Sequence, residues 1–154
     1  MLACYQRLQT PLFNVLYRWL WHTQDCEDVM HDAYLRIWDQ RQRIDATKLD
    51  ALVYTTALNL AKNKLRWRSL WRFGVRDEEA SDDARLDGVQ DRKRLKSALE
   101  ALDTDSRNLV LLSECAGFTT DELVAFFGWP AGTVASRKHR ALAQLRAALR
   151  EGER

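Results

Sequence analysis

Apolar side chains recur every three or four residues along most of this chain, and no stretch alternates polar and apolar positions as a half-buried strand would. In residues 24–40, Val29, Ala33 and Ile37 share one side of a predicted helix. A longer helix is predicted over residues 49–70. Its expected inward-facing residues are Leu49, Leu52, Val53, Ala57, Leu60 and Leu65. The spacing therefore predicts an all-α protein.

Two helices separated by a tight turn are predicted near the C-terminus. Thr119 and Glu122 have the spacing of a capping box, which places a helix start at or just after Thr119. Gly128 supplies a permissive backbone for ending that helix, and Pro130 prevents its continuation. Trp129 is expected to enter the core between the two helices.

The second of these helices is expected to begin near residue 131. Its predicted buried side consists of Val134, Ala141, Leu145 and Leu149. Its predicted exposed stripe consists of Thr133, Ser136, Arg137 and Arg140. This arrangement predicts a helix-turn-helix whose second helix suits the major groove of DNA. A plain αα-hairpin remains the alternative.

The net charge of +2 conceals a strong segregation of charge along the chain. Residues 49–76 hold six basic and one acidic side chain, residues 77–105 hold five basic and ten acidic, and residues 132–154 hold six basic and two acidic. Two basic segments on either side of an acidic one suit two separate surfaces for a polyanion. Solvated helix faces that happen to cluster are the alternative.

The acidic stretch also predicts the domain boundaries. Residues 74–88 show little apolar periodicity and much acid, as expected of a flexible linker. We therefore expect two small helical domains, residues 1–72 and 91–154, joined by an acidic flexible linker over residues 73–90. The second domain would contain the helix-turn-helix.

The predicted helix in residues 24–40 carries an acidic stripe. Asp25 is expected to cap this helix. The acidic stripe is formed by Asp28, Asp32, Leu35 and Asp39. Acidic side chains around one exposed leucine suit a basic helical partner, although this stretch alone favours a solvated face.

The predicted helix of residues 49–70 carries an amide–cation face. Its members are Asn59, Lys62, Asn63 and Arg66, with Thr55 or Thr56 above them. Amides and cations beside Trp67 and Trp71 suit single-stranded or distorted nucleic acid. For at least one of these tryptophans, packing against the first helix is the preferred interpretation.

Cysteine and histidine usage gives no support for a disulfide framework or a cofactor. Cys4, Cys26 and Cys115 are an odd and scattered set. His22, Cys26 and His31 lie close in sequence but lack a fourth ligand at compact spacing, so ordinary packing is favoured over a metal site. We therefore expect no cofactor.

Membrane insertion and catalysis are also disfavoured. No apolar run approaches the roughly 18 residues of a membrane helix, and Arg7 interrupts any stretch resembling a signal peptide. A cytoplasmic location is expected. A nuclease is disfavoured because the acidic pairs at 78–79 and 82–83 lie in the predicted linker, where a rigid metal site is improbable.

Three stretches together resemble a bacterial extracytoplasmic-function (ECF) sigma factor. QDCEDVMHDAYLRIW (24–38) looks like the family's core-polymerase-binding helix, with His31 where glutamine is usual. VYTTALNLAKNKLRWR (53–68) resembles the helix that reads the −10 element. Residues 101–142 resemble the C-terminal domain, including its P-x-G-T-V-x-S-R-x-x-R-A signature; Thr104 replaces a common proline and Ala135 a common basic residue.

The resemblance implies a promoter-specificity subunit of RNA polymerase rather than an enzyme. Implied contacts with core polymerase are Asp28, Asp32, Leu35 and Trp38. Implied contacts with the single-stranded −10 element are Asn59, Lys62, Asn63 and Arg66, with the loop 43–48 holding an extruded base. Implied contacts with the −35 duplex are Thr133, Ser136, Arg137, His139 and Arg140.

Within the −35 set, we expect Arg137 nearer the bases and Arg140 nearer the backbone. An anti-sigma factor, often membrane-bound in this family, is implied as a further partner. The alternative is a stand-alone helix-turn-helix transcriptional regulator. Such a regulator needs only the second domain and leaves the acidic stripe and the amide–cation face without a purpose.

Overall fold

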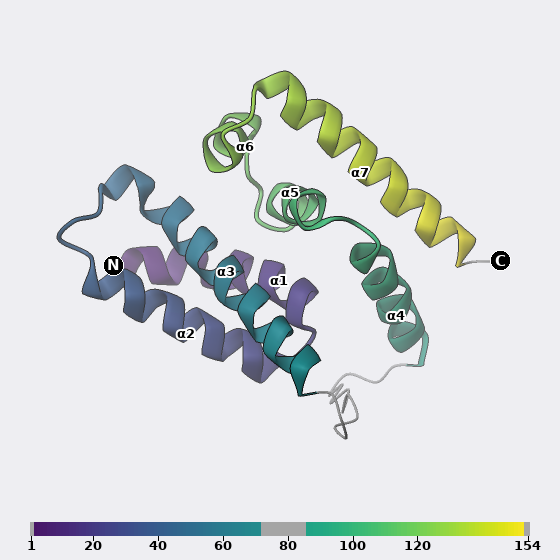
Figure 1. Ribbon diagram of the computed structural model, residues 1–154, viewed down its shortest axis with the longest axis horizontal. Coiled ribbons are helices and arrows are strands. Elements are labelled where there is room, and N and C mark those ends of the chain that lie inside the picture. Colours follow the sequence, from purple (N-terminus) through teal and green to yellow (C-terminus); the bar gives the residue numbers. More distant parts are fainter. Residues whose placement is uncertain (1, 72–85, 153–154) are drawn as a thin grey trace. The chain divides into compact units, whose positions relative to one another are not determined.

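The computed structural model describes residues 2–71 and 86–152, and within these two ranges the chain is helical and contains no strand, as Figure 1 shows. The prediction of an all-α protein is confirmed. The chain divides into two compact units, residues 1–80 and 81–154. Most of the predicted linker lies outside the described residues. Helix α4 begins at Leu86, so regular structure resumes before residue 91, where the second domain was expected to start.

The first unit consists of α1 (Leu2–Leu20), α2 (Thr23–Asp39), the short 3-10 helix η1 (Ala46–Lys48) and α3 (Leu49–Leu70). The three long helices pack against one another. The core side of α2 is as predicted, with Val29, Ala33 and Ile37 buried. On α3 the prediction holds for Val53 and Ala57, which are buried, but Leu52 is 37% exposed and was wrongly placed inside. The predicted inward residues Leu49, Leu60 and Leu65 are half-buried.

The prediction that Asp25 caps α2 is wrong. The helix begins at Thr23, and its N-cap is His22, whose Nδ1 accepts a hydrogen bond from the backbone N–H of Asp25 at 3.3 Å. Asp25 therefore lies inside the first turn. Its carboxylate is free to meet a different element of the unit, which is α3.

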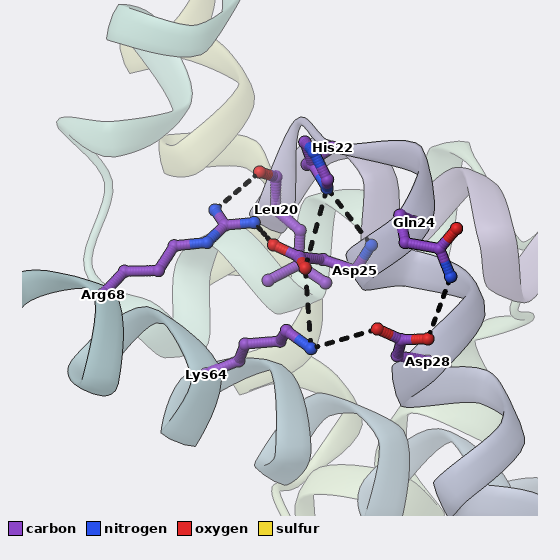
Figure 2. Close-up of polar contacts among 7 residues, drawn as sticks. All are labelled: Leu20, His22, Gln24, Asp25, Asp28, Lys64 and Arg68. Carbon is purple, nitrogen blue, oxygen red and sulfur yellow. Dashed lines mark hydrogen bonds and ion pairs between the residues drawn. The ribbon is translucent and has the colours of Figure 1, made fainter. Parts of the chain in front are cut away.

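The last turns of α3 are tied to the start of α2 by a corner network, formed by Asp25, Lys64 and Arg68 (Figure 2). Lys64 Nζ lies 3.5 Å from Asp25 Oδ1, and the guanidinium of Arg68 forms an ion pair with Asp25 Oδ2. Arg68 also donates a hydrogen bond to the carbonyl of Leu20, the last residue of α1, at 2.9 Å. One arginine thus joins the ends of all three helices of the unit.

The first residues of α3 are tied to α1 in a similar way. Arg7 Nη2 donates to Asp50 Oδ1 at 2.8 Å, and its second nitrogen pairs with the other carboxylate oxygen. The hydrogen bond from Arg7 is the main reason why the pKa of Asp50 lies below its usual range. This pair is largely exposed, so it fixes position more than it contributes to stability.

The second unit consists of α4 (Leu86–Glu100), α5 (Thr104–Glu114), α6 (Thr120–Phe127) and α7 (Ala131–Glu151). Helices α4, α5 and α6 each pack on α7. Leu123 of α6 and both Val134 and Ala141 of α7 are buried. Of the other predicted inward residues, Leu145 and Leu149 are half-buried.

The turn between α6 and α7 has the predicted chemistry. The capping box is present, since Thr119 Oγ1 accepts from the N–H of Glu122 and Glu122 Oε1 accepts from the N–H of Thr119, both at 3.2 Å. Gly128 ends α6 in the left-handed conformation, with φ of 71°, and Pro130 is the N-cap of α7. The predicted helix-turn-helix is therefore formed by α6 and α7.

We expect Gly128→Ala to destabilise the second unit by about 1 kcal/mol, because a residue with a Cβ is strained at positive φ. Gly132→Ala is the matched control, since Gly132 is helical and a Cβ there meets nothing within 4 Å. The control should be neutral or stabilising. Native-state hydrogen exchange of the α6 and α7 amides in the full chain measures the change in stability caused by each substitution. An equal loss of stability in the two variants would contradict the assignment of the turn.

We expect Asp25→Asn to destabilise the first unit by about 1–2 kcal/mol. The side chain of Asp25 is only 18% exposed, and the substitution removes the negative charge that Lys64 and Arg68 share, although Lys64 keeps its contact with Asp28. The magnitude lies between that of a surface pair and that of a buried one. Asp32→Asn, on the exposed side of the same helix, is the control. Hydrogen exchange at the end of α3 should speed up in the first variant and not in the second.

Candidate nucleic-acid interface and partner surface

The acidic stripe lies along the solvent side of α2. Asp28, Asp32 and Asp39 are exposed, and Leu35 is 49% exposed, although leucine is an apolar side chain. Asp28 differs from the others because it already has partners within the unit. Its oxygens meet Lys64 Nζ at 3.6 Å and accept a hydrogen bond from Gln24 Nε2 at 3.0 Å (Figure 2). Asp32 and Leu35 are therefore the more available part of the stripe.

Trp38 borders the acidic stripe and is 47% exposed. The guanidinium carbon of Arg41 lies 4.2 Å from the centroid of the Trp38 ring, and Arg41 Nη1 donates to the Trp38 carbonyl at 2.9 Å. One face of the indole is thus covered by a cation that belongs to the same chain. A partner that packs on Trp38 must use its other face or displace Arg41.

The loop from α2 to α3 contains a local cap. Asp45 accepts hydrogen bonds from the backbone N–H and the hydroxyl of Thr47, at 3.0 Å and 2.8 Å. The backbone bond is the main reason why the pKa of Asp45 is lowered. These bonds give residues 45–48 a defined backbone that ends at the first residue of α3. The role of the loop in holding an extruded base stays a prediction.

The amide–cation face lies on α3 as its spacing predicts, with Asn59, Lys62, Asn63 and Arg66 all exposed. The two threonines above it are less available. The hydroxyl of Thr55 donates to the Ala51 carbonyl at 2.8 Å, and Thr56 is half-buried. The face is therefore defined by two amides and two cations.

One apolar member of this face was missed from the sequence, and the preference for packing at least one of the two tryptophans inside is not met. Leu52 lies two turns before Asn59 and hence on the same side of α3. The seven-residue spacing between them would have allowed this position to be predicted from the sequence. The expectation that at least one tryptophan packs inside is wrong, because Trp67 is 60% and Trp71 is 70% exposed. Together with Leu70 they form an exposed apolar end to α3.

The polar stripe on α7 is turned slightly from its predicted orientation. Ser136, His139 and Arg140 are exposed, whereas Thr133 and Arg137 are half-buried. The exposed side is thus centred between Ser136 and His139. The α7 set is brought together on one helix, but its members differ in how far they reach into solvent.

Trp129 does not simply fill the core between α6 and α7. It is half-buried, its ring stacks on Phe127 with centroids 4.4 Å apart, and the guanidinium carbon of Arg137 lies 4.2 Å from its centroid. The neighbouring Lys138 is also half-buried, with Nζ 3.7 Å from Glu114 Oε1. Two basic side chains near the start of α7 are therefore engaged within the unit.

The suspected metal residues have structural places. Cys26 is fully buried, and burial raises the pKa of its thiol to about 12. His22 caps α2, and His31 is exposed. Over residues 2–71 and 86–152, no three histidine, cysteine or acidic side chains are grouped so that they could hold a metal ion. Among the helices described, none is long and apolar enough to cross a membrane.

Comparison with known proteins connects these surfaces with two domain families. Residues 4–73 match Sigma-70 region 2, and residues 92–145 match Sigma-70, region 4. The first region includes the acidic stripe and the amide–cation face. The second includes the helix-turn-helix.

Individual relatives agree with this assignment. RNA polymerase sigma-E factor of Streptomyces coelicolor is 32% identical over 79% of this chain and 70% of its own length. ECF RNA polymerase sigma factor SigL of Mycobacterium tuberculosis is 28% identical over 98% of this chain and 89% of its own length.

Solved structures give the same answer. The structure of CnrH in complex with the cytosolic domain of CnrY matches with a TM-score of 0.72 and 25% identity, over 97% of this chain and 86% of that one. The sigma factor RpoE in complex with the anti-sigma factor NepR from Bartonella quintana matches with a TM-score of 0.66 and 20% identity, over 97% and 98%, and supports the fold. From the two matched regions and the relatives named above, the chain belongs to the extracytoplasmic-function group of RNA polymerase sigma factors.

Proposed function

We propose that the contacts of a promoter-specificity subunit are divided among three helices of this chain. Helix α2 binds core RNA polymerase, α3 reads the unpaired −10 strand, and α7 reads the −35 duplex. The observation that carries the proposal is the distribution of the surfaces. Each unit matches a different sigma-70 region, and each presents its own polar, cation-bearing helix face.

The chemistry of α2 suits a basic protein partner. Asp32 offers an exposed carboxylate, and Leu35 and Trp38 offer apolar area next to it. Desolvated apolar anchors supply most of the affinity at protein interfaces, while surrounding charges govern orientation and association rate. We assign the strongest contacts to Leu35 and Trp38, and the choice of partner to the carboxylates.

The chemistry of α3 suits unpaired bases. Asn59 and Asn63 each present a donor and an acceptor, and they lie one turn apart on the exposed side. Lys62 and Arg66 beside them attract phosphates. The exposed rings of Trp67 and Trp71 continue the surface and suit base stacking.

The chemistry of α7 suits a duplex. An α-helix fits the major groove, where arginine pairs with guanine edges and hydroxyls hold phosphates. Thr133 and Arg137 flank the exposed side formed by Ser136, His139 and Arg140. A stand-alone regulator would need only this unit, whereas the match to region 2 and both faces of the first unit favour a sigma factor.

The work of the chain then requires no catalytic site of its own, because the polymerase carries out the chemistry. A cytoplasmic location follows from that partnership. We further propose control by an anti-sigma factor that covers these binding surfaces. Support comes from the RpoE structure, in which a protein of the same fold is bound to an anti-sigma factor.

The proposal as a whole is tested by run-off transcription with core polymerase on a genomic promoter library. Core polymerase with this chain should produce transcripts from a restricted set of promoters that core alone does not use. Tight duplex binding by the chain alone, with no effect on transcription by core, would favour a stand-alone regulator.

Asp32→Lys combined with Leu35→Ser should abolish co-purification with core polymerase. Both residues are exposed, so helix content by circular dichroism should stay unchanged. Asp28→Lys is a less clean test, because it would also repel Lys64. Glu27→Lys makes the same charge change on a different side of α2 and is the control. A normal yield of the complex with the double variant would show that this face is not the polymerase surface.

Asn59→Ala and Asn63→Ala should impair promoter opening more than closed-complex formation. Their amides meet base edges that are accessible only after the strands separate, so the loss should appear at the melting step. Permanganate reactivity of unpaired thymines measures opening, and gel mobility of the closed complex is the internal control. An open complex at parental level in both variants would remove Asn59 and Asn63 from the −10 surface.

A further inference from the structure

The side chain of Arg137 lies differently from its neighbours on α7. Ser136, His139 and Arg140 are exposed, whereas Arg137 is half-buried with its guanidinium carbon 4.2 Å from the centroid of the Trp129 ring. Trp129 belongs to the turn before α7. Arg137 therefore bends back over that turn instead of extending from the exposed side of the helix.

The ring of Trp129 packs on a second aromatic ring. It stacks on Phe127 with an interplanar angle of 14°, and Phe127 meets Phe126 edge-on with centroids 5.0 Å apart. Gly128, in its left-handed conformation, turns the chain between the two stacked rings. Phe127, Trp129 and Arg137 thus form a three-layer stack built on the turn of the helix-turn-helix.

The stack restrains the cation without using its hydrogen-bond donors. A guanidinium that lies on an indole uses its flat face, and its N–H groups point outward in the plane. The charge of Arg137 also reaches Asp103 at the start of α5, where it adds to the larger effect of the Ser106 backbone hydrogen bond in lowering the pKa of that carboxyl. Arg137 is therefore held at one edge of the exposed side, with donors available.

We propose that Trp129 is a positioning residue that holds Arg137 for a backbone phosphate of the −35 duplex. The inference rests on the proposed role of α7 and reverses the order expected from the spacing, so that Arg140 is the arginine nearer the bases. Base edges lie inside the groove and require a side chain that extends from the helix, whereas phosphates flank the groove. A cation restrained before binding loses less conformational freedom when it meets its phosphate.

The test compares Arg137→Ala, Trp129→Leu and their combination in the full chain. Binding is measured by fluorescence anisotropy on a labelled duplex carrying the −35 element of a promoter found by run-off transcription, and on a scrambled duplex, at several salt concentrations. Arg137→Ala should weaken both duplexes by the same factor, about tenfold, and reduce the slope of log K against log salt by about one. Trp129→Leu should also weaken binding to both duplexes. In the Arg137→Ala background, the same substitution should lower the affinity by less than about twofold.

Two further variants control for folding and for the proposed function. Trp129→Phe keeps an aromatic ring under Arg137 and should retain most of the parental affinity, which a general loss of packing would not allow. Arg140→Ala should weaken the matched duplex selectively. If the parent and Arg140→Ala each bind the matched and the scrambled duplex with equal affinity, α7 does not read the −35 element. If Arg140→Ala is selective but the Arg137→Ala loss is selective too, or the two single losses multiply in the double variant, the positioning role of Trp129 is overturned.

Discussion

The geometry of the first unit depends on the ion pairs that hold both ends of α3. Asp50 at its first turn is bound by Arg7 of α1. Figure 2 shows the other end, where Arg68 is bound to Asp25 of α2 and to the carbonyl of Leu20. The apolar core between these ends includes the fully buried Tyr54, Leu12 and Leu16. The charged contacts add directional restraints at the two ends of α3. The amide–cation face on α3 and the acidic stripe on α2 therefore have one fixed relation to each other.

These ties also change the meaning of the charge pattern. Residues 49–76 carry six basic side chains, and this excess was the first indication of a polyanion surface. In the structure Lys64 and Arg68 face Asp25, and Asp28 of the acidic stripe is neutralised in part by Lys64. The positive charge that α3 presents to solvent is consequently smaller and more localised than the sequence count suggests. It is concentrated at Lys62 and Arg66, beside the two asparagines.

Local chemistry explains what could be predicted from the sequence. The capping box and the left-handed Gly128 depend on residues within a few positions of one another, and both were predicted correctly. Helical spacing also identified the buried sides of α2 and α7. The error at Asp25 concerns a choice between neighbours far apart in the chain, because this carboxylate pairs with cations of α3 instead of capping its own helix. The roles of the site residues likewise depend on partners outside the chain.

In both units some cations take part in contacts within the chain, through ion pairs or by stacking on a ring. A sigma factor must keep some cations available for DNA and use others to hold its helices, and both kinds are the same amino acids in the sequence. In the first unit Arg7, Lys64 and Arg68 are paired with carboxylates, an interaction that salt screens when it is exposed. In the second, Arg137 lies on a tryptophan that is itself stacked on Phe127. Because stacking uses the face of the guanidinium and an ion pair uses its edge, an arginine that is stacked on a ring can be restrained and still donate to a phosphate.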